Sequence, residues 1–368
     1  MNNDTLYMKR CLQLAKCGEY YTAPNPMVGA ALVYDGKIIG EGFHRRYGGA
    51  HAEPNAIRSV KEPSLLEKST LYVNLEPCSH YGKTPPCADL IVSKQIPRVV
   101  IGSSDPNPKV AGKGIEILTN AGIEVTVGVM EDACRMLNKR FFTYFLQKRP
   151  YVFLKWAQTY DAFIDKKRQS VENGKALLIS NDVTAQLTHK MRAENQAIMV
   201  GTQTIALDNP HLTLRNWRGR NPVRIAIDRR LRINREFNIF DGKTPTVLFT
   251  EKEHPPKKNV AKKNVEYIKI DFNEKLIENM LNMCYKKNIQ SVLVEGGAQL
   301  LNTFIASGLW DEANVEVGHT AIGNGVQAPA FSDVPDIVKT YGGNKWLHYK
   351  NKHKQPVSAE NIENVSNV

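Results

Sequence analysis

The sequence predicts a two-domain α/β protein. Its 368 residues exceed what one core usually needs, because domains commonly hold about 100 to 200 residues. Short β-rich apolar runs alternate with helix-like segments along the chain, which is typical of layered α/β folds. The segment 141–150 ends an amphipathic helix and 151–156 begins a new strand. We therefore expect domains over 1–146 and 147–350, followed by a flexible tail over 351–368.

The first domain shows well-separated strand and helix patterns. Two runs flank Asp35-Gly36, a dipeptide that favours a tight hairpin turn. The expected strands are 28–34, 37–42, 70–75, 98–102 and 124–128. The expected helices are 5–18, 52–60, 87–93 and 112–121.

The second domain repeats the alternation with apolar strands separated by helical or loop stretches. The expected strands are 151–156, 197–201, 223–228, 246–250, 265–270, 291–295 and 313–317. The Pro- and Lys-rich stretch 251–263 is predicted to be an exposed loop, and the polar tail lacks periodicity.

Composition excludes several classes of protein. The chain is 42% hydrophobic and 23% charged, and no run approaches the roughly 18 apolar residues that span a bilayer. Its polar start lacks a secretory signal, so we expect a cytoplasmic protein. The net charge of +12 could favour anionic partners, but short lysine runs in the predicted loop account for much of it. The six cysteines form no disulfide framework, and only Cys78 and Cys87 lie in a setting that suggests chemistry.

The strongest motif is His51-Ala52-Glu53, followed by Pro77-Cys78 and then Cys87. One imidazole and two thiolates leave a tetrahedral zinc with one position open to water, which is typical of a catalytic site. Zinc lowers the pKa of that water towards about 7. A glutamate two residues after the histidine can shuttle protons without binding the metal. Zinc nucleobase deaminases have the signature His-x-Glu with Pro-Cys-x-x-Cys, from which this chain departs only in having eight residues between the cysteines instead of two.

Other interpretations of these residues remain open at this point. Eight residues separate the two cysteines, and we expect Thr84 to cap a helix with Pro85 first, which places Cys87 in the first turn. His80 and Lys83 of this loop are candidates to contact substrate. The cysteines could instead be buried free thiols, or part of a structural zinc site completed by His44 or His80.

Three further motifs sharpen the prediction. They are the loop 22–30, the long insert 77–87 and Asp105-Pro106-Asn107-Pro108. Together they resemble the bifunctional deaminase/reductase family of riboflavin biosynthesis over nearly the whole chain. The resemblance implies a cytidine-deaminase-like three-layer N-terminal domain and a dihydrofolate-reductase-like α/β C-terminal domain. It also implies one zinc ion per chain, NADPH, and a phosphorylated pyrimidine that is first deaminated and then reduced from ribosyl to ribityl.

The resemblance also implies roles for individual residues. The zinc ligands would be His51, Cys78 and Cys87, and Glu53 would be the catalytic proton shuttle. Substrate binding is expected from Asn25, His80, Lys83, Arg192, Arg215, Leu212 and Glu295. Cofactor binding is expected from Thr204, Asp208, Gly296 and Gly297. Independently, arginine forks suit a phosphate, and glycines after a strand let backbone amides approach one.

This chain departs from the family pattern at three places in the reductase half. Tyr160-Asp161-Ala162 stands where Leu-Asp-Gly is usual, and Leu178 stands where tryptophan is usual. The stretch between Asp161 and Gly174 is also longer. These departures concern the cofactor pocket.

Two competing functions predict different sequence features. A tRNA-type nucleic-acid deaminase with a basic accessory domain would show basic stripes interleaved with aromatic residues, which the sequence lacks. A zinc-stabilised binding module would leave Glu53 without a purpose. We therefore expect a small-molecule enzyme without nucleic-acid or membrane partners, and by analogy with paired deaminase domains we expect a homo-oligomer.

Overall fold

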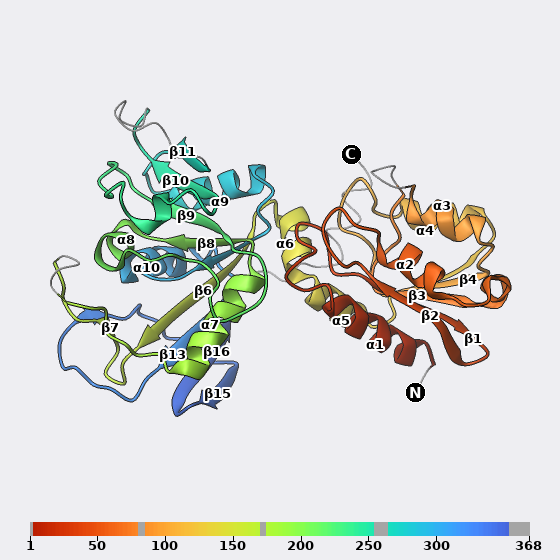
Figure 1. The fold of residues 1–368 in the computed structure, drawn as a ribbon, viewed down its shortest axis with the longest axis horizontal. Coiled ribbons are helices and arrows are strands. Elements are labelled where there is room, and N and C mark those ends of the chain that lie inside the picture. The colour runs from red at the N-terminus through yellow and green to blue at the C-terminus, as the bar shows by residue number, and fades with distance from the viewer. Residues whose placement is uncertain (1–2, 80–84, 170–173, 254–263, 353–368) are drawn as a thin grey trace. The chain divides into compact units, whose positions relative to one another are not determined.

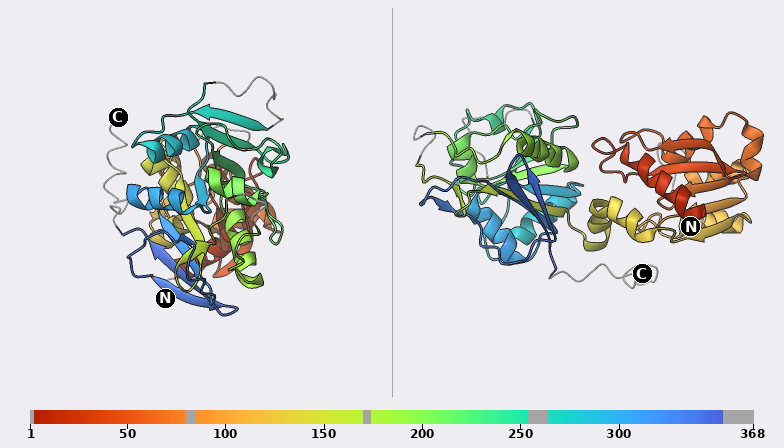
Figure 2. Two further views of the ribbon diagram at one scale, coloured as in Figure 1. Left: turned by 90° about the vertical axis from the view of Figure 1, so that its left-hand side faces the viewer. Right: turned by 90° about the horizontal axis from the view of Figure 1, so that it is seen from below.

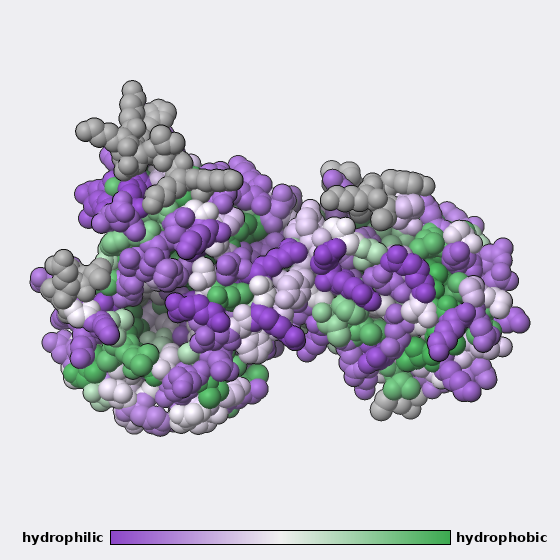
Figure 3. All heavy atoms as spheres, viewed as in Figure 1, coloured by the Kyte–Doolittle hydropathy of each residue, from purple (hydrophilic) through white to green (hydrophobic). Residues whose placement is uncertain are grey.

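The computed structural model describes residues 3–79, 85–169, 174–253 and 264–352 (Figure 1). The chain forms two compact units that meet in sequence between Gln147 and Lys148. None of the helices within the described ranges is long and apolar enough to cross a lipid bilayer. On the face shown in Figure 3, hydrophilic side chains predominate and the apolar residues form separate patches.

The first unit contains a five-stranded sheet in the order β2-β1-β3-β4-β5. Strand β1 pairs antiparallel with β2 and β3, whereas β3, β4 and β5 are parallel. The strands are β1 Gly29–Tyr34, β2 Lys37–Phe43, β3 Thr70–Val73, β4 Arg98–Ile101 and β5 Glu124–Val127. The α-helices are α1 Asn3–Lys16, α2 Ala52–Ser59, α3 Cys87–Ser93, α4 Lys113–Asn120, α5 Glu131–Leu137 and α6 Lys139–Gln147, and a 3-10 helix spans Pro63–Lys68.

Alternation along β1 explains why this unit has three layers. Ala30 and Leu32 join a core cluster with residues of α2, α3 and α4, whereas Ala31 and Val33 join one with residues of α1. Successive side chains of a strand point to opposite faces, so one apolar strand supplies both cores. Helix α2 packs closely on β2, since a Cβ added at Gly42 would lie 2.3 Å from the backbone N of Ala56. This contact places the start of α2, and the residues it carries, beside the sheet.

The second unit contains a nine-stranded sheet in the order β11-β10-β9-β8-β12-β6-β13-β16-β15. All neighbours pair in parallel except β13–β16 and β16–β15. The strands are β6 Tyr151–Gln158, β8 Ala197–Val200, β9 Val223–Ile227, β10 Thr246–Thr250, β11 Val265–Lys269, β12 Ser291–Val294, β13 Glu312–Val317, β15 Ile337–Tyr341 and β16 Asn344–Lys350. A separate pair joins β7 Phe163–Asp165 to β14 Val326–Gln327. The α-helices are α7 Asp182–Glu194, α8 Thr202–Asp208, α9 Leu276–Lys286 and α10 Ala298–Ser307, and a 3-10 helix spans Asn238–Phe240.

Strand β6 lies inside the sheet and is buried over its first six residues, and helices cover both faces of the sheet (Figure 2). Val152, Leu154 and Trp156 join the large core with α9 and α10, whereas Tyr151 and Phe153 join a core with α7. Parallel strands buried on both faces commonly show such continuous apolar runs.

Most of the expected elements agree with the structure to within a few residues. The hairpin turns at Asp35 and Gly36 as predicted, with φ of 49° and 69°, the positive values that a tight two-residue turn requires. Strands β15 and β16 had no counterpart among the expected strands. The tail and the loop over 251–263 fall largely outside the described residues. Asn351, where the tail was expected to begin, donates its side-chain amide to the carbonyls of Gly308 and Trp310.

Candidate active sites of the two units

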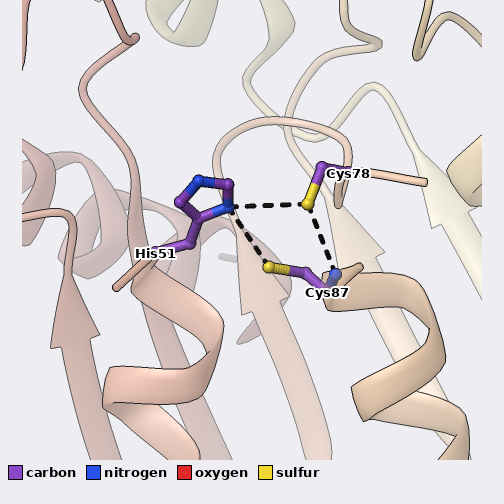
Figure 4. Close-up of side chains that lie close together, drawn as sticks. All are labelled: His51, Cys78 and Cys87. Carbon is purple, nitrogen blue, oxygen red and sulfur yellow. Dashed lines mark hydrogen bonds between the residues drawn. The ribbon is translucent and has the colours of Figure 1, made fainter. Parts of the chain in front are cut away.

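Three metal-ligand side chains meet in the first unit (Figure 4). His51 precedes α2, Cys78 lies in the loop after β3, and Cys87 begins α3. The Nδ1 atom of His51 lies 3.5 Å from the sulfur of Cys78 and 3.4 Å from that of Cys87. A tetrahedral zinc with bonds of about 2.0 Å to nitrogen and 2.3 Å to sulfur would separate such ligands by roughly 3.6 Å. The three residues therefore fit a zinc ion that keeps one open position.

The start of α3 favours the thiolate form of Cys78, whereas the hydrogen bond to Cys78 and burial raise the pKa of the Cys87 thiol. The backbone N–H of Cys87 donates to the Cys78 sulfur at 3.3 Å, and hydrogen bonds from Cys87 and His51 lower the pKa of the Cys78 thiol to about 4. The sequence-based expectation that Pro85 opens the helix is wrong, because Pro86 is the N-cap and the helix begins at Cys87. Cys87 nevertheless occupies the first turn as expected. Thr84, His80 and Lys83 lie outside the described residues.

Glu53 is a buried carboxyl group beside this cluster. It is the second residue of α2 and only 3% exposed, and its Oε2 has no hydrogen-bond partner among the described residues. Burial raises the pKa of its carboxyl group, while the positive charge of His51 opposes that shift. An oxygen held this way is available to a water molecule or a substrate rather than committed to the fold. Glu53 is also not one of the three clustered metal-ligand side chains.

His44 does not complete a structural metal site. Its ring meets the ring of His51 edge to face at 5.4 Å, but both of its nitrogens have other partners. Nδ1 lies 3.0 Å from the carbonyl oxygen of Ala50, which can only accept a hydrogen bond, and Nε2 lies 3.2 Å from the Asn25 amide nitrogen. Burial lowers the pKa of His44, so the neutral ring donates from Nδ1 and accepts at Nε2. Asn25 is thus held near the metal ligands through His44.

Sequence reasoning did not assign roles to two buried carboxyl groups near Cys78. The carboxylate of Glu76 accepts the backbone N–H groups of Asp105, Gly112, Gly114 and Ile115 at 3.0 to 3.4 Å. Asp105 is 7% exposed, and burial raises its pKa to about 7, helped by the charges of Glu76 and Cys78. The sequence signal for Glu76 was its position as a charged residue directly after the expected apolar strand 70–75.

In the second unit, two predicted substrate residues form a buried ion pair. Glu295 follows β12 and Arg192 lies on α7. The Nε and Nη2 atoms of Arg192 donate to the two carboxylate oxygens at 2.7 and 2.6 Å, and Nη1 donates to the carbonyl of Thr213 at 3.2 Å. Most of the guanidinium fork is therefore already engaged within the protein.

A second charged pair lies beside the first and was missed from the sequence. Lys155, in the middle of β6, lies 3.7 Å from Glu316, which also accepts from Ser180 and Asn344 at 2.6 and 2.7 Å. Burial lowers the pKa of the Lys155 ammonium group, although Glu316 and Glu295 oppose that shift. A lysine inside an otherwise apolar strand was the signal for this pair, because a buried lysine needs a compensating partner.

Three of the predicted cofactor residues, Thr204, Gly296 and Gly297, lie together at the carboxyl ends of β8 and β12. Gly296 and Gly297 have φ of 100° and 70°, and a Cβ added at Gly297 would lie 3.2 Å from the Thr204 hydroxyl oxygen. Thr204 and Asp208 are four residues apart on α8, so they share one face of that helix. Two consecutive glycines without side chains would let backbone N–H groups of this turn approach a phosphate group.

The remaining predicted substrate residues differ in exposure. Arg215 is exposed, and its backbone N–H lies 3.4 Å from Nδ1 of the buried His189. Leu212 is 4% exposed and belongs to a core cluster, so it can offer a ligand only its backbone.

The family departures also have visible structural consequences. Ala162, where glycine is usual, has a φ of 63° in the left-handed region. Tyr160 and Leu178 are 76% and 84% exposed. The neighbouring Asp161 accepts the backbone N–H groups of Ile322 and Gly323 at 2.9 and 2.7 Å.

Comparison with known proteins agrees with the two sites. Residues 1–103 match the model of the cytidine and deoxycytidylate deaminase zinc-binding region, and residues 150–359 match that of the RibD C-terminal domain. The fold and the sites thus define a zinc-dependent deaminase joined to a reductase. The chain belongs to the RibD family of riboflavin biosynthesis proteins. It is a bifunctional deaminase and reductase of that pathway, and its fold class is the one predicted.

The similarity extends over nearly the full length of the relatives. The riboflavin biosynthesis protein RibD of Aquifex aeolicus is 40% identical over 326 residues, which cover 88% of this chain and 89% of the relative. The RibD protein of Escherichia coli is 32% identical, with coverages of 96% and 97%. A crystal structure from Thermotoga maritima, titled a diaminohydroxyphosphoribosylaminopyrimidine deaminase/5-amino-6-(5-phosphoribosylamino)uracil reductase, is 37% identical with a TM-score of 0.83, covering 95% and 98% of the two chains.

Proposed function

We propose that the first unit converts 2,5-diamino-6-(5-phosphoribosylamino)pyrimidin-4-one into 5-amino-6-(5-phosphoribosylamino)uracil, and that the second unit reduces the ribosyl group of this product to ribityl with NADPH. The observation that carries the proposal is the meeting of His51, Cys78 and Cys87 beside a buried Glu53 oxygen that has no hydrogen-bond partner among the described residues. The name of the Thermotoga relative, which joins these two activities, supports the choice of substrate.

For the deaminase step, we assign His51, Cys78 and Cys87 to one zinc ion per chain. When bound, this ion supplies a water molecule with a lowered pKa as the nucleophile. Glu53 takes a proton from that water and delivers protons to the ring nitrogen and to the departing amine. The water oxygen bonds to the ring carbon, the carbon–nitrogen bond breaks, and ammonia leaves.

Substrate recognition in the first unit is assigned to Asn25, His80 and Lys83. The hydrogen bond to His44 uses the amide nitrogen of Asn25, so its amide oxygen remains for a donor group of the pyrimidine. His80 and Lys83 belong to the insert between the two cysteines, where positive charge suits a phosphate.

For the reductase step, we assign Thr204, Asp208, Gly296 and Gly297 to NADPH. The exposed Arg215 would bind the substrate phosphate, with the backbone of Leu212 beside it. Arg192 and Glu295 are held as a pair, so they would orient the sugar rather than neutralise a free anion. When bound, NADPH would supply the hydride for the sugar carbon that becomes the ribityl CH₂, and the reduction would also take up one proton.

One experiment tests both activities. Purified zinc-loaded protein is incubated with the diaminopyrimidine substrate, with and without NADPH, and the products are identified by mass. We expect ammonia and the uracil product without NADPH, and the ribityl product only when NADPH is present. Ammonia from adenosine or cytidine in RNA, with none from the small substrate, would instead support a nucleic-acid deaminase and overturn the proposal.

A further inference from the structure

Arg168 is a nearly buried arginine on the longer stretch that separates Asp161 from Gly174. Its side chain is only 5% exposed although it follows the short strand β7 on a connecting segment. Long charged side chains are seldom buried in such a position unless their donors are paired. The partners of Arg168 therefore indicate what this segment does.

All three guanidinium nitrogens of Arg168 have acceptors. Nε donates to Oδ2 of Asp165 at 2.8 Å, and Nη2 contacts the same oxygen. Nη2 also donates to Oδ1 of Asp208 at 2.6 Å, and Nη1 donates to the carbonyls of Leu207 and Gly174 at 3.1 and 3.4 Å. Arg168 thus joins β7, Gly174 and the end of α8.

The contact with Asp208 offsets an unfavourable local charge. Asp208 is the last residue of α8, where the helix presents unsatisfied carbonyl groups and a partial negative charge. A carboxylate at this end is repelled by the helix, and it would also repel the phosphates of a dinucleotide. Arg168 binds both the Leu207 carbonyl and the Asp208 carboxylate, so it cancels this charge and fixes the side chain.

Only one oxygen of Asp208 is used in this contact. Arg168 binds Oδ1, and a carboxylate has a second acceptor oxygen. Thr204, one helical turn earlier, lies against the Gly296-Gly297 turn, so this face of α8 is the one directed to the proposed cofactor site.

We propose that Arg168 is a positioning residue for the nicotinamide cofactor, holding Asp208 by Oδ1 so that its other oxygen accepts a hydrogen bond from a hydroxyl group of the dinucleotide. This inference rests on the proposed cofactor role of Asp208. The guanidinium N–H groups of Arg168 already donate to acceptors within the protein, so Arg168 is not proposed to bind a phosphate itself. Its effect on the cofactor passes through Asp208.

The test measures NADPH binding to the full-length zinc-loaded protein in the absence of pyrimidine substrate. All four tryptophans, at 156, 217, 310 and 346, lie in the second unit, so quenching of their fluorescence reports binding there. We expect Arg168→Ala and Asp208→Asn each to raise the Kd for NADPH about tenfold, the effect of one charge-assisted hydrogen bond. The double variant should bind NADPH no more weakly than the weaker-binding single variant, because Arg168 is proposed to act only through Asp208.

Two further variants separate positioning from general damage to the fold. Arg168→Lys keeps the positive charge but loses the planar guanidinium group, so its affinity for NADPH should lie between those of Arg168→Ala and the parent protein. Lys287→Ala removes a paired cation elsewhere in the same unit, where Lys287 binds Glu266 at 2.6 Å, and should leave the Kd unchanged. Ammonia release should be normal in every variant, which confirms that the first unit is intact, and an unchanged urea midpoint of tryptophan fluorescence checks the fold of the second unit.

The outcomes distinguish the two levels of the proposal. An unchanged Kd in Asp208→Asn would refute the cofactor role of Asp208. A weakened Asp208→Asn with an unchanged Arg168→Ala would leave that role standing and refute the positioning role of Arg168. Additive effects in the double variant, or full affinity in Arg168→Lys, would likewise overturn the inference.

Discussion

The two units build their sites in different ways. In the first unit, the metal ligands and the proton shuttle come from two short motifs at the starts of neighbouring helices, and the cluster depends on three side-chain atoms. In the second unit, the central pair of Arg192 and Glu295 is 103 residues apart in sequence, and strand order brings it together. A metal site can thus be specified locally, whereas this reductase site is specified by the topology of its sheet.

The two sites also balance charge differently. The first leaves a buried carboxyl oxygen of Glu53 without a described partner, so part of the site is completed only by its ligands. The second pairs each buried cation with a carboxylate, namely Arg192 with Glu295 and Lys155 with Glu316. Substitutions in the first site should therefore change chemistry more than stability, and those in the second should change both.

The largest effect is expected from Glu53→Gln. The amide keeps the size of the side chain but cannot carry the proton, so ammonia release should fall by about 10²- to 10⁴-fold. Zinc content, measured by atomic absorption, should remain one per chain, and the reductase should still act on supplied uracil intermediate. Deamination at the native rate would show that Glu53 is not the proton shuttle.

A large effect on stability is expected from Glu295→Ala. This change leaves the buried Arg192 without its partner, which typically costs about 3 to 5 kcal/mol. Urea unfolding followed by tryptophan fluorescence, which reports the second unit alone, should shift to lower urea, and reductase activity should be lost while deamination persists. The matched control is Arg229→Ala at the more exposed pair with Glu251, where the change should be below about 1 kcal/mol. Equal shifts in the two variants would contradict the view that the buried pair holds this site together.

A smaller effect is expected from pH through His189. Burial, together with the nearby charges of Arg192 and Arg215, lowers its pKa to about 4, although Glu295 opposes that shift. Between about pH 6.5 and 4, His189 is protonated in the unfolded chain but neutral in the folded protein. Its contribution to the free energy of unfolding is therefore fully present above about pH 6.5 and declines as the pH falls towards 4. The urea midpoint of the tryptophan signal at pH 5 and pH 7 measures this loss.

The control for this prediction is His189→Asn, whose amide oxygen can replace Nδ1 as the acceptor for the Arg215 N–H. The difference between the two midpoints should be smaller in this variant than in the parent protein. An identical pH dependence in both proteins would exclude His189 as its source.

Much of the fold and of the deaminase site was predictable from the sequence. Alternating or continuous apolar residues predicted the strands. The turn at Asp35 and Gly36 was predicted because Asp-Gly pairs favour tight hairpin turns. The metal cluster was predictable because few sets of side chains bind zinc. His51, Cys78 and Cys87 could therefore be assigned to one site before the arrangement of the strands was known.

The rest depended on contacts between distant segments. Nothing local to Lys155 indicates Glu316 as its partner, because the pair forms only when β6 and β13 lie side by side. The packing of Leu212 in the core and the clamp of Arg168 on Asp208 have the same origin. The start of α3 was misplaced by two residues because a helix boundary depends on backbone hydrogen bonds that a capping pattern fixes only approximately.

The smallest effect is expected from Ala162→Gly, which tests a single backbone angle in the second unit. Ala162 has a φ of 63°, a conformation that costs a residue with a Cβ about 1 to 2 kcal/mol. Glycine removes this cost but adds conformational freedom to the unfolded chain, worth about 0.4 to 1 kcal/mol. The variant should therefore be more stable by roughly 0.5 to 1 kcal/mol, seen as a higher urea midpoint of tryptophan fluorescence with deamination unchanged. Ala162→Val should move the midpoint the other way, since a β-branched side chain tolerates a positive φ even less. A lower midpoint for the glycine variant would mean that the alanine side chain stabilises this turn more than its backbone angle strains it.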